Sequence, residues 1–295
     1  MNQFREVGHA GLDYRLGFTQ DPGLEVLDTL QTAVNGYQEI KTVTARSGLD
    51  IMKNIKTSFN YGYKTSSSFD QGIEKETVSE DYFPMGDTGD EGFPFPSWTV
   101  RVSGLEKIPF VDKFFQSLSL NHSFSGKRDE SYRDGDLLTS SYRTGFSPLV
   151  AVSMKFKKDI NSNFRINTSK SIRNQDGGMS QEEQIGYSFD LNYKHRGGIT
   201  LPLPFMENKR FDNNIDFTLA FEYSDSKSKN KQVDMDKLVT GDERSNLSIK
   251  PRIGYSFSDK VTGGVFMQYQ INNNNTTGER KNLNYGFDVN IAIRG

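Results

Sequence analysis

Three short acidic motifs are the first places where the sequence could support chemistry. Asp87–Gly89 (DTG) matches the triplet of aspartic proteases, whose reaction needs two buried carboxylates that share a proton. Here the triplet lies in the polar segment MGDTGDEG, without an apolar flank or a second copy. Asp134–Asp136 (DGD) and Asp234–Asp236 (DMD) could offer oxygen ligands to calcium, but neither has the spacing of a calcium loop of about 12 residues. All three motifs are therefore predicted to be solvated loop tips.

The 3 histidines, His9, His122 and His195, lie on different segments of the chain. None has the spacing of a metal-ligand set or a nucleophile beside it. A phosphate-binding loop and a dinucleotide fingerprint are both missing from the sequence, and Ile271–Gly278 (INNNNTTG) has the composition of a polar hairpin tip. We therefore expect that the protein is no enzyme, with no catalytic residue, no cofactor, no metal and no nucleic-acid partner.

The segments around these residues alternate strictly between apolar and polar side chains. In Lys250–Ile271, for example, Ile253, Tyr255 and Phe257 alternate with small or polar residues, and the pattern resumes after a short turn. A period of two residues is typical of a β-strand with one apolar face. The same pattern recurs at Leu12–Phe18, Ile55–Tyr63, Val150–Phe156, Ile185–Tyr193, Ile215–Tyr223 and Leu283–Ile293.

We count about 12 such strands, most of them about 10 residues long, which is the length that a tilted strand needs to cross a bilayer. Tight turns are expected near Met52–Asn54, Lys157–Asn161 and Ser258–Lys260. Long polar loops are expected at Asp70–Gly92, Lys127–Thr139, Arg173–Glu182, Ser226–Glu243 and Asn272–Lys281. With this assignment the short turns lie on one side and the long loops on the other, as in outer-membrane barrels, and the C-terminus lies on the short-turn side.

Composition agrees with a barrel wall better than with a soluble core. Hydrophobic residues are 34% of the 295 residues, aromatic residues are 12%, the formal charge is -2 and cysteine is absent. The mean hydropathy is -0.66, and no run of about 18 apolar residues could form a transmembrane helix. Met1–Phe18 has neither the basic start nor the apolar stretch of a signal peptide, so a protein acting outside the cytoplasm would be expected to have a longer start.

The alternative to a membrane barrel is a soluble all-β domain, because alternation alone is found in both. Long regular apolar faces, aromatic residues near strand ends and polar opposite faces favour lipid. One face is then expected to meet lipid through Phe217, Leu219, Phe221, Phe287, Val289 and Ile291. The other is expected to meet a wet lumen through Asp216, Glu222, Asp288 and Asn290.

Four segments interrupt the pattern. Phe93–Trp98 (FPFPSW) and Leu201–Phe205 (LPLPF) have proline at every second position, which predicts extended rim segments and not central strands. Lys107–Gln116 suits a short helix, at the membrane interface or as a plain connection. Leu24–Ile40 is ambiguous and could be a short helix. Residues 1–41 are read as a first strand and a connecting segment, and residues 42–295 as one domain of antiparallel hairpins.

The hairpin segments resemble the C-terminal end of the SprA/Sov family, which supplies the outer-membrane barrel of the type IX secretion system in Bacteroidetes. The resemblance covers roughly residues 42–295, and its most specific pieces are SGLEK after the tryptophan, GFSPL with its following strand, and the RG end. It is carried by Phe93–Gly126, Tyr142–Ser171, Leu201–Ser224, Lys250–Gln270 and Asn284–Gly295.

This resemblance implies a protein-conducting translocon in the cell outer membrane that passes folded cargo to the surface and supports gliding motility. The family's barrel has about 36 strands, so this chain would be a C-terminal piece of its wall. The implied partners are membrane lipid, cargo proteins with C-terminal sorting domains, a PorV-like barrel and a periplasmic plug protein. A self-closing porin-like or transporter barrel and a barrel enzyme or soluble β-domain are the alternatives. Cargo, gate position and lumen contacts are not specified by the sequence.

Overall fold

Alternating segments of the chain form long antiparallel β-strands in a computed structural model. The structure describes residues 36–70, 72–86, 88–175, 177–197, 199–203, 206–211, 213–231, 238–258 and 260–292. The predicted strand Leu12–Phe18 lies outside these residues, as does most of Leu24–Ile40. The described end of that second segment, Gly36–Ile40, belongs to a strand, so the helical alternative is wrong there.

The strands fall into an N-terminal and a C-terminal half of the chain. The first half contains β1 (Gly36–Met52), β2 (Ile55–Asp70), β3 (Ile73–Met85), β4 (Glu91–Pro94), β5 (Ser97–Val102), β6 (Phe115–Arg133) and β7 (Asp136–Phe156). The second contains β8 (Ile160–Gln175), β9 (Gly178–His195), β10 (Ile199–Leu203), β11 (Met206–Phe211), β12 (Ile215–Lys231), β13 (Val239–Ser256), β14 (Val261–Asn274) and β15 (Gly278–Ile291).

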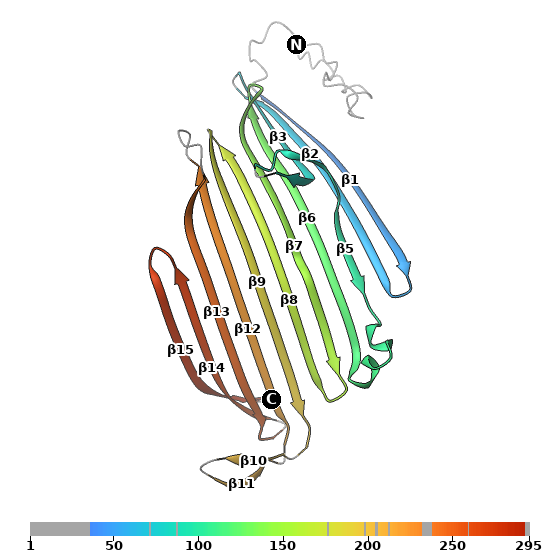
Figure 1. Ribbon diagram of the computed structural model, residues 1–295, viewed down its shortest axis with the longest axis vertical. Helices are drawn as coiled ribbons and strands as arrows, with labels where there is room; N and C mark the ends of the chain where they lie inside the picture. The colour runs from blue at the N-terminus through green and yellow to red at the C-terminus, as the bar shows by residue number, and fades with distance from the viewer. Residues whose placement is uncertain are drawn as a thin grey trace, which may run out of the picture.

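All but two of these strands form one antiparallel 13-stranded sheet in the order β15-β14-β13-β12-β9-β8-β7-β6-β5-β2-β3-β4, with β1 on the outer side of β2. The sheet is a single layer of long strands that lie side by side (Figure 1). In the described part of the chain, β1 pairs only with β2 and β15 only with β14, so both ends of the sheet are open edges. The all-β antiparallel fold that the alternation predicts is confirmed.

β3 and β5 together fill one position of the sheet, between β2 and β6. The first part of β3 pairs with β2 over Ile73–Glu80 and with β6 over Lys75–Asp81. β5 continues the same position, pairing with β2 at Ile55–Asn60 and with β6 at Leu120–Phe124. Between the two the chain leaves the sheet, and Tyr82–Met85 pairs with β4 in a separate short hairpin, as Figure 1 shows above β5. We call Tyr82–Pro94 the flap.

The strands are about twice as long as predicted, and this is the main correction to the sequence-based expectation. β6 has 19 residues, β7 has 21, and β9 and β13 have 18 each. The predicted long loops are mostly strand. For example, the turn within Lys127–Thr139 is only Asp134–Gly135, where Gly135 has a φ of 86° that a side chain would strain. The apolar alternation ends in mid-strand because polar residues occupy both faces beyond it, while the backbone ladder continues.

The tight turns lie where the sequence predicts them, at Lys53–Asn54, at 157–159 and between β13 and β14, where Phe257, Ser258 and Lys260 are described. They share one end of the sheet, and the extended ends of β6–β7, β8–β9 and β14–β15 share the other (Figure 1). β15 ends at the tight-turn end, as predicted. The sorting by loop length is wrong, because the described turns at the far end are short as well, and the long connections from β5 to β6 and from β9 to β12 lie at the tight-turn end (Figure 1).

The irregular segments follow the predictions only in part. The prolines of Phe93–Trp98 do precede the ladder, but Ser97 and Trp98 begin β5, which is an internal strand because backbone N–H groups are again available there. β10 and β11 form a two-stranded sheet apart from the large one. Lys107–Gln116 is not one helix: 3-10 turns η1 (Leu105–Lys107) and η2 (Val111–Lys113) are separated by Phe110, whose φ of 81° interrupts helical geometry.

No helix in the described residues is long and apolar enough to span a membrane.

Candidate functional site

The register of the sheet gathers the apolar side chains of all its long strands into one band on one face. Phe217 on β12 lies opposite Tyr193 on β9 and Ile253 on β13. The same row continues through Val265 to Phe287 on the edge strand. The predicted partition of Phe217, Leu219, Phe221, Phe287, Val289 and Ile291 onto one face is confirmed by this register. We call this side the apolar face.

Within the described part of the chain, most of the apolar face is not covered by a second layer. The side chains of Phe287 and Tyr285 are 81% and 76% exposed, and Val265 is 64% exposed. Apolar or aromatic side chains that are buried in the described residues are confined to Tyr82, Phe124, Tyr142, Ala151 and Ile172. An exposed, contiguous apolar surface that crosses several strands indicates contact with lipid or with another protein, because exposing it to water is energetically unfavourable.

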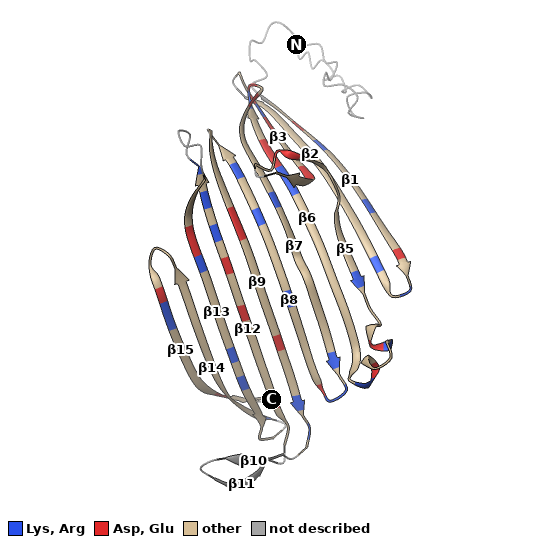
Figure 2. Ribbon diagram, in the orientation of Figure 1, with Lys and Arg blue, Asp and Glu red and all other residues tan. Residues whose placement is uncertain are grey.

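The opposite face is mostly polar, and its charges form cross-strand pairs. Lys194 lies 3.7 Å from Asp216, and Arg252 lies 2.8 Å from Asp288. The ammonium of Lys250 is 3.8 Å from Glu222, in the middle of β12 and β13. Charges of both signs recur along the strands (Figure 2). A polar macromolecule can contact such a surface without burying apolar area.

A groove of about 470 Å³ crosses the polar face over β8, β9, β12, β13 and β14. It is hollow because Thr218 and Ala220 place small side chains in its centre. Amide side chains line it on the neighbouring strands, with Phe266 at one end. Amides both donate and accept hydrogen bonds, so the groove can pair with the polar groups of a polypeptide. The amides are Asn161, Asn163, Asn192 and Gln268.

Beyond the apolar band, the apolar face becomes charged. This charged zone lies in the half of the strands that was predicted to be loop. Glu80 is 5% exposed and accepts hydrogen bonds from Arg128, at 2.7 Å, and from the Tyr61 hydroxyl, also at 2.7 Å. The guanidinium of Arg128 lies 4.7 Å from the centre of the Tyr82 ring. Burial, with the hydrogen bond that Tyr132 donates to Glu130, raises the pKa of Tyr132 to about 12. The alternation pattern could not reveal this network, because Glu80, Arg128, Glu130 and Tyr132 lie where the apolar period has ended and only Tyr61 belongs to an alternating segment.

The flap folds over the apolar face at the boundary between the apolar band and this charged zone. Gly89 is buried there with a φ of 81°, and a Cβ at this position would come within 2.9 Å of the Tyr142 ring on β7. The Phe83 ring lies 5.3 Å from that of Phe124 on β6. Trp98 stacks on Phe124 with the ring centres 4.2 Å apart. The flap thereby covers the place where β3 gives way to β5.

Only some of the motifs with possible chemistry lie in the described residues. Asp87 and Asp234–Asp236 lie outside the described residues. Thr88 donates a hydrogen bond to Asp90 within the flap. Asp134 occupies the β6–β7 turn, where its carboxylate accepts the N–H of Glu74 at 2.9 Å.

The histidines serve local contacts. His122 Nδ1 is 2.7 Å from the Leu149 carbonyl, and His195 Nδ1 is 3.0 Å from the Tyr193 hydroxyl, whereas His9 lies outside the described residues. Among the residues that the structure describes, no group of three or more histidine, aspartate or glutamate side chains is arranged to hold a metal ion.

No protein-family model matches the chain, and no curated protein matches it. Among solved structures, the chain is similar to OmpTdeltaL8, a loop L8 deletion mutant of OmpT, which is an outer membrane protein of Vibrio cholerae. The two are 7% identical, the match covers 87% of this chain and 99% of that one, and the TM-score is 0.26.

Proposed function

We propose that the chain is part of the wall of an outer-membrane β-barrel whose polar face lines a protein-conducting channel. The observation that carries the proposal is the uncovered apolar band, which follows the register across the sheet while the reverse face stays polar. From Ile215 to Tyr223 the band spans eight residue steps of about 3.4 Å, or about 27 Å along the strand. At a tilt of about 40° this gives a height of roughly 21 Å, close to the apolar band of outer-membrane barrels.

The open edges favour a wall that continues beyond the described strands. Inside hydrocarbon each unpaired backbone group costs several kcal/mol, so β1 and β15 both need a neighbouring strand. A 13-stranded open sheet therefore suits a large barrel better than a small self-closing one. The porin-like or transporter alternative would require β1 and β15 to pair with each other.

The assignment to type IX secretion rests on the resemblance to the SprA/Sov family. On this proposal the cargo is a folded protein with a C-terminal sorting domain, and transport supports gliding motility. A PorV-like barrel and a periplasmic plug protein would be the partners. Catalysis has no part in this function.

Face-specific labelling tests the membrane placement. In membranes that contain the full-length protein, Glu222→Cys should react with a water-soluble maleimide, whereas Leu219→Cys should be protected by lipid. The two positions lie on the same strand, so accessibility of the strand itself is controlled. Reaction at 219 with protection at 222 would overturn the placement.

Cross-linking to cargo separates a translocon from a porin-like channel. A photo-cross-linker at Ser188, on the polar face of β9, should capture cargo in transit, and the same group at Phe189 on the apolar face should not. Small solutes passing through a porin would leave no protein adduct at either position. A cell in which secretion proceeds normally but Ser188 captures no cargo would contradict the translocon proposal.

A further inference from the structure

Amide side chains run in a row along the polar face of β14 and β15. On β14, Gln268, Gln270 and Asn272 follow one another at every second position, toward the end of the sheet that lies away from the tight turns. The register places Asn284 beside Gln268 and Asn282 beside Gln270 on β15. We call these five residues the amide track. β14 carries no charged residue along its length, in contrast to β13 and β15 (Figure 2).

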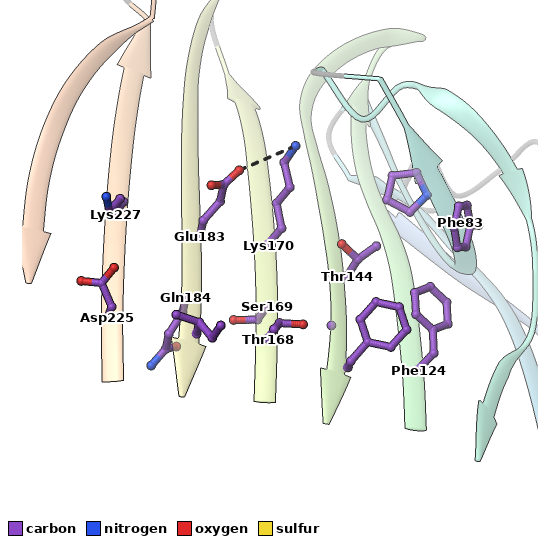
Figure 3. A pocket seen from close by; sticks show the side chains of 14 residues that line it. Phe83, Phe124, Thr144, Thr168, Ser169, Lys170, Glu183, Gln184, Asp225 and Lys227 are labelled. Atoms are coloured by element: carbon purple, nitrogen blue, oxygen red, sulfur yellow. Dashed lines mark ion pairs between the residues drawn. The ribbon is translucent and has the colours of Figure 1, made fainter. Parts of the chain in front are cut away.

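The amides of the track are left without partners inside the protein. In the part of the chain that the structure describes, the five side chains form no hydrogen bond with another residue. The groove beside the flap, of about 570 Å³ on the apolar face, is different, because Lys170 lies 4.0 Å from Glu183 there (Figure 3). An amide offers an oxygen that accepts hydrogen bonds and an NH₂ group that donates them. The track therefore presents both kinds of partner to a ligand.

A hollow lies at each end of the track. At one end is the groove of about 470 Å³ over β12, which both Gln268 and Phe266 line. At the other end, Asn272 and Asn246 line a hollow of about 390 Å³. From Phe266 to Asn272 the strand takes six residue steps of about 3.4 Å, or about 20 Å. This length suits a chain of ligand units better than a single small molecule.

Phe266 adds an aromatic ring to a face that is mostly polar. The ring lies over Gly286 on β15, where a Cβ would come within 2.9 Å of it. An aromatic ring can pack against the C–H groups of a sugar ring, because its negative face attracts their partial positive charge. An apolar platform beside a few polar groups is typical of a small-ligand site.

The charges around the two hollows balance one another. The cations that line them are Lys250, Arg252, Arg244 and Arg280. Three of these cations have a carboxylate partner within 3.8 Å, namely Glu222, Asp288 and Asp242. Asp190, which lines the groove over β12, is the fourth carboxylate. Four cations and four carboxylates leave no net charge, so charge complementarity favours a neutral ligand.

We propose that the amide track binds a neutral saccharide chain. This inference goes beyond the proposed channel and does not depend on the membrane placement. A sugar hydroxyl both donates and accepts hydrogen bonds, as the amides do. A polypeptide offers one N–H and one C=O per residue, and its side chains would stand between these groups and the track. The saccharide can be free or attached to a protein, since both sources present the same hydroxyls.

Saturation-transfer NMR with the full-length protein in lipid nanodiscs tests the inference. The probes are neutral oligosaccharides of glucose, mannose, galactose and N-acetylglucosamine. An oligogalacturonate is the acidic counterpart, and a glycine–serine peptide of similar length is the polypeptide counterpart. At least one neutral oligosaccharide should bind, and it should bind more tightly than the oligogalacturonate or the peptide.

Variants then assign the contacts. Gln268→Ala combined with Gln270→Ala should weaken binding about tenfold, because several hydrogen bonds are lost. Phe266→Ala should also weaken binding, whereas Phe266→Tyr should retain it because the ring is kept. Gln38→Ala combined with Asn121→Ala is the matched control: it removes two amides from the polar face on β1 and β6, away from the track, and should change nothing.

A glycoprotein with a neutral mannose glycan distinguishes the two sources of saccharide. It competes with the bound oligosaccharide if the track accepts a glycan that is attached to a protein. The same protein without its glycan should not compete. Binding of the oligosaccharide without competition by the glycoprotein assigns the track to free saccharide.

Two results would overturn the inference. If no neutral oligosaccharide binds, or if the track variants leave binding unchanged, the amides are ordinary solvated side chains. Tighter binding of the oligogalacturonate or of the peptide would mean a different class of ligand. Maleimide labelling of Leu219→Cys separates this failure from failure of the proposed function. Protection at 219 without saccharide binding overturns only the saccharide site, whereas reaction at 219 with saccharide binding overturns only the membrane placement.

Discussion

Replacing Leu219 by arginine is the sharpest test of the apolar face. Leu219 lies midway between Ile215 and Tyr223, which bound the band on β12, with Leu191 and Pro251 beside it on β9 and β13. Four residue steps of about 3.4 Å at a tilt of about 40° put it roughly 10 Å from either edge of the band. An arginine at the bilayer midplane costs about 2–4 kcal/mol, which is a loss of roughly 30- to 1000-fold in the folding equilibrium.

The size of this effect should depend on depth and on face. Tyr223→Arg, at the band edge, should cost about 0–1 kcal/mol. Glu222→Arg, on the polar face, should cost less than about 1 kcal/mol, because the Glu222–Lys250 pair is 3.8 Å long and its side chains are 63% and 43% exposed.

The assay is guanidinium unfolding of the full-length protein in isolated membranes, with proteolysis of the unfolded fraction. The midpoint should fall clearly only for Leu219→Arg. Equal destabilisation by all three variants, or a mild effect at Leu219, would refute the reasoning.

Three further predictions concern orientation, the charged zone and the edges. Epitope tags at Gly135 and Asn54 should be reached by antibody on intact cells only at Gly135, and the opposite pattern would mean an inverted topology. Arg128→Ala should destabilise the protein by roughly 3–5 kcal/mol in the same unfolding assay, because it leaves the buried Glu80 carboxylate without its cation. Arg143→Ala should cost under about 1 kcal/mol, because Arg143 is 66% exposed and 3.7 Å from Asp129, so equal effects would contradict the buried network. The isolated chain in detergent should aggregate through β1 and β15, and a stable monomer with slow amide exchange on both strands would favour a self-closing barrel.

The two faces of the sheet could be predicted from the sequence because side-chain direction in a strand is a local property. A period of two places Phe217, Leu219 and Phe221 on one side and Glu222 on the other, whichever strands lie beside them. Tight turns are also local, since they need only a few polar residues between two alternating runs. The apolar band and one end of the sheet were therefore predictable from the chain alone.

Where polar residues occupy both faces, the alternation disappears although the strand continues. The sequence therefore gives no sign that Glu80 and Arg128 face each other, or that β3 and β5 share one position between β2 and β6. Those features depend on register between segments distant in sequence, and the flap depends on the same pairing. Backbone hydrogen bonds between strands form whatever the side chains are, so the sequence does not show where a strand ends. Long-range pairing determines the length of the strands and the positions of the charged network and of the groove beside the flap. Only the tertiary structure shows this pairing.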